Sequence, residues 1–219
     1  YDGELYTMRE GGQPQKVNVI IRTQEKNNAD KFISINGGVR EMAISPNGKE
    51  IAFVARGEVF VTSVDGSLTK RITNTPEAER FVTFSPDGKS VVYAAERDGK
   101  WSIFKTTRQR EAQEPFFFAS TLISEEPMIS GEVDAYMPNF SPDGKKIAYI
   151  KDRRNLVVRD VASGAETVLL NQDDLFHMSD GDKYFTWSPD SKWLLVDWSK
   201  LLNNSEVLLM AADGSQRIN

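Results

Sequence analysis

The sequence contains no cysteine, which excludes disulfide bonds, thiolate metal sites and thiol nucleophiles. It has a single histidine, His177, and no Gly-x-Ser-x-Gly segment, so it offers almost no material for a nucleophilic serine triad. No apolar run approaches the roughly 18–20 residues that cross a bilayer. The sequence therefore predicts a chain without catalytic residues of its own, without a cofactor and without membrane insertion.

Net positive charge is also absent. The formal net charge is -5 and the pI is about 5.1, with lysine and arginine scattered along the chain. Such a chain presents no sustained positive field for phosphates, so we expect no nucleic-acid partner. The composition, with 39% hydrophobic and 27% charged residues, is ordinary for a globular chain that buries a core.

One short motif is repeated. The hexapeptide FSPDGK occurs at 84–89 and again at 140–145, and near copies, ISPNGK and WSPDSK, occur at 44–49 and 187–192. The four motif serines, which we call the turn serines, are Ser45, Ser85, Ser141 and Ser188, spaced by 40, 56 and 47 residues. Intervals of this length are typical of a repeated unit of four strands.

The motif has the chemistry of a strand reversal. Proline presets φ near -65°, aspartate suits the next position, and glycine adopts the left-handed conformation of a bulged hairpin. Short apolar strands stand on both sides of each motif, and several, such as SVVYAA at 90–95, are apolar on both faces. Serial four-stranded antiparallel sheets covered on both faces indicate an all-β fold, a β-propeller; a β-sandwich does not explain the recurring turn.

Ser191 interrupts this pattern because it occupies the glycine position of the fourth motif. A residue with a side chain in a left-handed conformation costs about 1 kcal/mol relative to glycine. The sequence alone therefore predicts that Ser191→Gly stabilises the protein modestly.

We expect residues 1–219 to form one propeller segment of about four and a half blades. Residues 1–35 are predicted to be the end of one blade and a connection, and the blades follow at 36–75, 76–130, 131–175 and 176–219. Because an open arc leaves apolar blade faces wet, we also expect further blades outside these residues.

The SPDGK motif followed by IAY or VVYAA resembles the TolB-like propeller repeat. Residues 44–106, which include RGEVF, RITNTPEAER and ERDG, also resemble the amino-terminal propeller of tricorn-type peptidases, and the segment EPFFFASTLISEEP is similar to one in that family. The resemblance implies that the parent is a serine peptidase whose catalytic domain lies outside this chain. The sequence leaves the compartment unknown and only slightly favours the bacterial periplasm over the cytoplasm.

Alignment of the blades places four residues at one position, five before each turn serine: Arg40, Arg80, Tyr136 and Lys183. This position begins the innermost strand of a blade, so we expect these residues to surround the axial channel. Three cations and a tyrosine would attract carboxylates such as peptide carboxy termini. Alternatively, the neighbouring acids Glu41, Glu79 and Asp182 neutralise the cations.

Phe116, Phe117 and Phe118 stand in the longest interval between turns. They are predicted either to fill the groove between blades or to form a patch that docks another domain or subunit.

Four acids flank His177, namely Asp173, Asp174, Asp180 and Asp182. Their spacing does not match an EF-hand loop, and we expect solvated loop acids and a non-catalytic histidine, with calcium as the minor alternative.

Three functions remain open. The first is a non-catalytic propeller that filters or delivers peptides, or unfolded polypeptide, to a peptidase domain of the same protein. The second is a TolB-like propeller that binds a protein partner and has no enzymatic activity. The third is an architectural propeller that mediates contacts in a homo-oligomer.

Overall fold

The structure, a computed structural model, describes residues 5–18, 37–174, 184–201 and 204–219, except for the side chains of residues 172, 198–201, 204 and 205. The chain divides into two units, residues 1–36 and 37–219. In the first unit, β1 (Tyr6–Thr7) and β2 (Gln15–Lys16) pair antiparallel. The sequence assigns these residues to the last strands of a blade, and this assignment stays a prediction.

The second unit contains four antiparallel sheets, each of four strands in chain order. Blade 1 comprises β3 (Val39–Ile44), β4 (Glu50–Ala55), β5 (Glu58–Ser63) and β6 (Thr69–Arg71). Blade 2 comprises β7 (Glu79–Phe84), β8 (Ser90–Arg97), β9 (Lys100–Arg108) and β10 (Ile123–Ile129). Blade 3 comprises β11 (Ala135–Phe140), β12 (Lys146–Lys151), β13 (Asn155–Asp160) and β14 (Glu166–Leu170). Blade 4 comprises β15 (Phe185–Trp187), β16 (Trp193–Leu201), β17 (Asn204–Ala211) and β18 (Arg217–Ile218).

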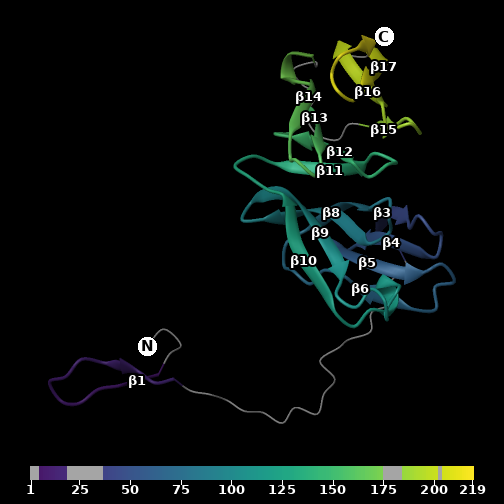
Figure 1. Ribbon diagram of the computed structural model, residues 1–219. Coiled ribbons are helices and arrows are strands. Elements are labelled where there is room, and N and C mark those ends of the chain that lie inside the picture. The colour runs from purple at the N-terminus through teal and green to yellow at the C-terminus, as the bar shows by residue number, and fades with distance from the viewer. Residues whose placement is uncertain (1–4, 19–36, 175–183, 202–203) are drawn as a thin grey trace. The chain divides into compact units, whose positions relative to one another are not determined.

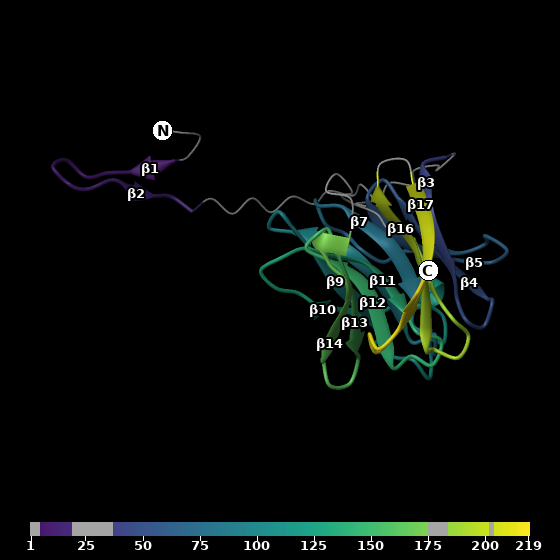
Figure 2. The same ribbon diagram turned by 90° about the horizontal axis from the view of Figure 1, so that it is seen from above.

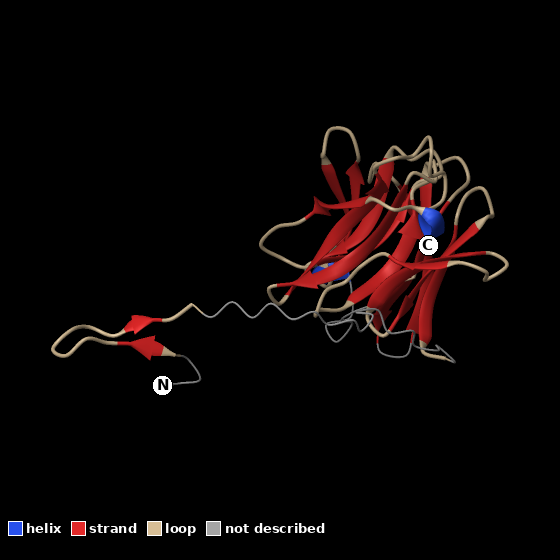
Figure 3. Cartoon of the chain, turned by 90° about the horizontal axis from the view of Figure 1, so that it is seen from below, coloured by secondary structure: helices blue, strands red, loops and turns tan. Residues whose placement is uncertain are grey.

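These sheets are arranged as propeller blades, so the predicted all-β propeller fold is confirmed (Figures 1 and 2). Strands dominate the described residues, with loops at both ends of the blades (Figure 3). The short 3₁₀ turns are η1 (Phe117–Ala119) and η2 (Gln172–Asp174). Within the described residues, no helix has the length and apolarity needed to span a membrane.

The repeated motif forms the turn between the first two strands of every blade. In blade 2 the Ser85 hydroxyl donates to Asp87 Oδ1 at 2.6 Å and accepts the Ser90 N–H at 2.9 Å. The Gly88 N–H donates to the Ser85 carbonyl at 2.8 Å, and Gly88 has a φ of +70°. The turn closes because serine and aspartate satisfy its backbone donors locally, as such side chains do in Asx and ST turns.

Blades 2 and 3 have a neighbouring blade on each of their two faces. We call the face toward the next blade the front face and the opposite face the back face. On β4, Ala52 and Val54 belong to the front face, and they share a buried cluster with Tyr93 on the back face of blade 2. The alternation of the pleat separates the two sets, and it explains why these strands are apolar throughout.

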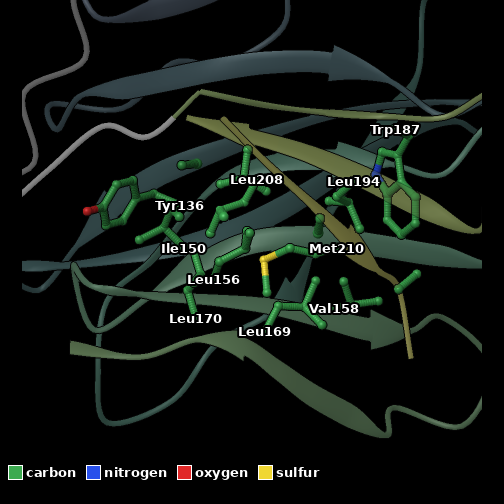
Figure 4. Close-up of a cluster of buried hydrophobic side chains, with 14 residues drawn as sticks. Tyr136, Ile150, Leu156, Val158, Leu169, Leu170, Trp187, Leu194, Leu208 and Met210 are labelled. Carbon is green, nitrogen blue, oxygen red and sulfur yellow. The ribbon is translucent and has the colours of Figure 1, made fainter. Parts of the chain in front are cut away.

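The largest buried cluster joins blades 3 and 4. Ile150 and Leu156 of blade 3 pack with Leu194 and Leu208 of blade 4, and all four are fully or almost fully buried (Figure 4). Apolar burial stabilises this joint by about 1.5–3 kcal/mol for each fully buried large side chain, and the Trp187 indole N–H adds a hydrogen bond to the Asn139 carbonyl at 3.0 Å.

The fourth strand of blade 2 lies partly within the segment EPFFFASTLISEEP, residues 114–127. Residues 123–129 form β10 and pair with β9. The strand carries ISEEPMI, whose central acids and proline do not alternate with apolar residues. An outermost strand has one solvated edge, which tolerates both charge and proline.

Candidate functional site

The inner strands of the four blades line an open axial pocket of about 290 Å³. Each of these strands, β3, β7, β11 and β15, is the edge of its own sheet. The pocket receives Met42 from β3, Phe81 and Thr83 from β7, Met137 and Asn139 from β11, and Phe185 from β15. The described lining carries no charged side chain, so the pocket suits an apolar group with one or two polar contacts.

Two inner strands are bulged at the pocket. The pairing shifts register between Arg80 and Thr83 on β7 and between Tyr136 and Asn139 on β11. Phe81 and Met137, the residues at these shifts, both have a φ of +57°. A bulge turns backbone groups out of the ladder, and side chains must then satisfy them.

Glu41 supplies the partner for the bulge on β7. Its carboxylate accepts hydrogen bonds from the Phe81 N–H and from Arg80 Nε, the latter at 3.1 Å. Glu41 belongs to blade 1 and Arg80 to blade 2, so this contact joins two neighbouring inner strands. A charge-assisted pair of this kind fixes the relative position of the two inner strands.

The same contact recurs at the next joint with different chemistry. Phe81 stands four residues before the turn serine of blade 2, and Tyr136 stands five before that of blade 3. Their ring centroids are 5.7 Å apart. Glu41 and Arg80 hold the same relative positions in blades 1 and 2. The residue four positions before the turn serine of one blade therefore contacts the residue five positions before the turn serine of the next blade. We call this the rim contact.

The four residues predicted to surround the channel are not equivalent. Arg80 and Tyr136 both contact Phe81, Arg80 with its guanidinium 4.2 Å from the ring centroid. Arg40 is exposed, and Lys183 lies outside the described residues. Arg80 already pairs with Glu41, and this weakens the case for a carboxylate ligand at the four channel positions. Such a ligand stays a prediction.

The three phenylalanines lie in two different environments. Phe117 is fully buried between blades 1 and 2, where Arg108 lies 4.2 Å from its ring centroid. Phe116 and Phe118 are half-buried and stack on each other at 5.1 Å. Phe117 thus fills the groove, and the predicted docking role is confined to the outer pair.

Glu50 holds the segment that carries the three phenylalanines in place, and the sequence analysis missed it. The carboxylate is 1% exposed and accepts the Phe117 N–H at 2.6 Å, at the start of η1. Burial raises the pKa of Glu50, although the backbone N–H groups and Arg108 act in the opposite direction. Glu50 follows the turn lysine directly, and the other blades have Ser90, Lys146 and Trp193 there, so no repeated pattern identifies it.

A second buried acid, Glu79, lies at the start of β7. It is fully buried and accepts hydrogen bonds from Thr73, Thr75 and Arg97, the last at 2.9 Å. Burial raises the pKa of Glu79 against these hydrogen bonds. The sequence analysis treats Glu79 as a possible neutraliser of Arg80, whereas its carboxylate bonds Arg97.

The acidic loop is only partly described. Asp174 pairs with Arg217 at 2.6 Å, and His177, Asp180 and Asp182 lie outside the described residues. Among the described residues no group of three or more acids or histidines is placed to hold a metal ion. The calcium alternative stays a prediction.

Fold and pocket together define an array of β-propeller blades around an axial site. The family described as TolB beta propeller domain matches residues 5–219, and the chain belongs to this family. No curated protein matches the chain at a significant level.

Several solved structures share the fold. TolB from Acinetobacter baumannii is 21% identical with a TM-score of 0.60, over 85% of this chain and 43% of that one. A TolB from Agrobacterium tumefaciens is 20% identical with a TM-score of 0.60, over 80% of this chain and 59% of that one. The tricorn protease is 15% identical with a TM-score of 0.55, over 98% of this chain and 20% of that one. This chain therefore spans less than two thirds of each of these proteins.

Proposed function

We propose that the chain is a protein-binding propeller of the TolB type, which takes an extended segment of a partner protein at its axial pocket. The observation that carries the proposal is the pocket itself: four sheet edges converge on an uncharged cavity of about 290 Å³. Exposed sheet edges bind extended chains through main-chain hydrogen bonds, and an adjacent apolar pocket selects a side chain. Membership of the TolB family supports the binding function over an enzymatic one.

The size and lining of the pocket indicate what would enter it. A cavity near 300 Å³ is at the lower limit for ligand pockets and accommodates one large side chain rather than a cofactor. Methionines adapt their shape to different apolar groups, and Met42 and Met137 stand in the lining with Phe81 and Phe185. We therefore expect a segment with an aromatic or aliphatic anchor residue.

Fluorescence anisotropy with short labelled peptides tests the proposal. Peptides with a central phenylalanine should bind, and matched peptides with a central aspartate should bind at least about tenfold more weakly. Thr83→Lys, which places a cation in the lining, should weaken binding by a similar factor. Thr69→Lys on the outer strand β6 is the matched control and should not change it. Equal binding of both peptides, or an effect of Thr69→Lys as large as that of Thr83→Lys, would contradict the proposal.

A second candidate is the propeller portion of a tricorn-like serine peptidase, which filters or delivers peptides to a catalytic domain outside this chain. The segments RGEVF, RITNTPEAER and ERDG within residues 44–106 and the alignment of 98% of the chain with the tricorn protease favour it. Both candidates use the axial pocket, so the peptide assay does not separate them. Sequencing the complete coding region does: a serine peptidase domain in the same polypeptide supports this candidate, and a polypeptide without one excludes it.

A further inference from the structure

A second pocket, of about 310 Å³, lies between blades 2 and 3, at the end of the blades that carries the repeated turns. We call it the joint pocket. Its lining includes Pro86 and Ser90 of blade 2 and Phe140, Gly144 and Val161 of blade 3. It shares no described residue with the axial pocket, so it is a separate site.

At the preceding joint, between blades 1 and 2, the equivalent position is filled by Phe117. Phe84, which like Phe140 directly precedes its turn serine, has its ring centroid 6.2 Å from that of Phe117. Glu50, which like Ser90 stands five residues after its turn serine, accepts the Phe117 N–H at 2.6 Å. The groove that holds Phe117 is therefore repeated at the next joint as an open pocket.

A third correspondence lies at the end of the third strand. Arg108 directly follows the residue that pairs with the fifth position after the turn serine, and its guanidinium lies 4.2 Å from the Phe117 ring centroid. Val161 has the same place in blade 3 and lines the joint pocket. The joint pocket thus keeps the position of this wall and replaces a cation by an apolar side chain.

The length of one connection explains why only the first of these grooves is filled by the chain's own residues. In blade 2 the third and fourth strands are joined by residues 109–122, which carry Phe117. In blade 3 the same connection comprises only residues 161–165, VASGA. This short connection has no aromatic side chain, so it supplies no counterpart of Phe117.

The lining offers a ligand apolar surface and one hydroxyl group. Asp87 and Asp143 also line the pocket, but each already accepts the hydroxyl of its own turn serine, at 2.6 and 2.7 Å. Lys105 pairs with Glu126 at 2.7 Å. Ser90 is only 8% exposed, and its hydroxyl makes no hydrogen bond with any residue that the structure describes. A buried hydroxyl gains from a hydrogen-bond partner, which a backbone N–H or carbonyl of a ligand can provide.

We infer that the joint pocket binds a partner protein through a phenylalanine in a short turn, in the way that Phe117 occupies the preceding groove. The ring packs against Phe140 and Val161, and a backbone group beside it bonds the Ser90 hydroxyl. An aromatic side chain buries a large apolar area with few rotatable bonds, which is why such residues anchor interfaces. The joint pocket is then a second contact for a protein partner, independent of the axial pocket.

Fluorescence anisotropy with a labelled, amidated peptide PFFFAS, the sequence of residues 115–120, tests the inference. Every arm uses the Thr83→Lys background, which weakens binding at the axial pocket, so a failure here is distinct from a failure of the proposed function. PFFFAS should bind at least about tenfold more tightly than PFAFAS, in which alanine replaces the central phenylalanine. Ser90→Phe places a ring in the joint pocket and should weaken binding of PFFFAS by a similar factor.

Val161→Arg gives the decisive arm, because it introduces the cation that Arg108 supplies beside Phe117. It should strengthen binding of PFFFAS about two- to fivefold, as an exposed cation–π contact does. Val64→Arg makes the same change at the equivalent place of blade 1, outside the joint pocket, and should leave binding unchanged. A gain of affinity cannot come from misfolding, so this arm holds even where Ser90→Phe folds poorly.

Four outcomes would overturn the inference. They are equal binding of the two peptides, no binding of PFFFAS in the Thr83→Lys background, no gain in Val161→Arg, and a gain of the same size in Val64→Arg. Sedimentation velocity of the chain without peptide adds a fifth: self-association that Ser90→Phe abolishes would make a second copy the occupant, in place of a partner protein.

Discussion

Replacement of Ser191 separates two opposing contributions at the fourth turn. Ser191 has a φ of +61°, where the other turns have Gly48, Gly88 and Gly144 at +68° to +71°. Its hydroxyl accepts the Asp143 N–H at 3.1 Å, and this hydrogen bond joins the turn of blade 4 to that of blade 3. Glycine relieves the left-handed strain but removes the acceptor.

The two contributions are similar in size. The strain of a side chain in this conformation is about 1 kcal/mol, and a net hydrogen bond contributes about 1 kcal/mol. Ser191→Gly should therefore change the free energy of unfolding by less than about 0.5 kcal/mol, and not stabilise the protein as the sequence alone predicts. Ser191→Ala keeps the strain and loses the hydrogen bond, so it should be destabilised by about 1 kcal/mol.

Urea unfolding of the wild type and the two variants measures these differences, and calorimetry gives them as melting temperatures. For a unit of this size about 1 kcal/mol corresponds to about 2–4 °C, so glycine should melt that much higher than alanine. The Gly minus Ala difference isolates the backbone strain, because both variants lack the hydroxyl. An alanine variant as stable as the glycine variant would refute the left-handed turn, and a glycine variant clearly more stable than the wild type would refute the role of the hydrogen bond.

Four further substitutions, at three residues, probe buried and turn positions. Phe117→Ala empties a fully buried site between blades 1 and 2 and should cost about 3–5 kcal/mol in urea unfolding; a cost below about 1 kcal/mol would contradict its burial. Glu50→Ala leaves the Phe117 N–H without its acceptor and should cost about 2 kcal/mol. Because burial raises the pKa of Glu50, the wild type should lose stability relative to Glu50→Gln as pH rises above 4.5 through that raised pKa; a constant difference would refute this. The Ser63 hydroxyl and Ser67 lower the pKa of Asp65 to about 2, so the wild type should lose stability relative to Asp65→Asn as pH falls from 3.8 to about 2, and a parallel pH dependence of the two would contradict the turn hydrogen bonds.

The turns and strand order were predictable from the sequence because their determinants are local. In the motif Ser85–Gly88, serine and aspartate satisfy neighbouring N–H groups and glycine supplies the positive φ, all within a few residues. The same local chemistry correctly marks Ser191 as an outlier. Period-two apolar strands on both sides then specify the hairpin.

The contacts between blades were not predictable in the same way. Glu50 bonds the Phe117 N–H over 67 residues, and Glu41 bonds Arg80 over 39. The sequence alone suggests pairs between acids and cations that are adjacent in the chain, so it pairs Glu79 with Arg80. The fold instead brings Arg97 to the Glu79 carboxylate. The positive φ of Phe81 likewise follows from the bulge and not from any preference of phenylalanine.

The rim contact distinguishes joints between nearly identical repeats. The turns are alike in all four blades, and short connections such as 72–78 and 130–134 already place successive blades side by side. At the inner rim the chemistry differs from joint to joint: an ion pair between Glu41 and Arg80, then an aromatic pair between Phe81 and Tyr136. A misordered array would place Glu41 against Tyr136, which leaves the carboxylate without its cation while Phe81 loses its aromatic partner. Discrimination of this kind comes from the unfavourable wrong pairs as much as from the correct ones, and it resides in two positions per blade that a search for repeated motifs would pass over.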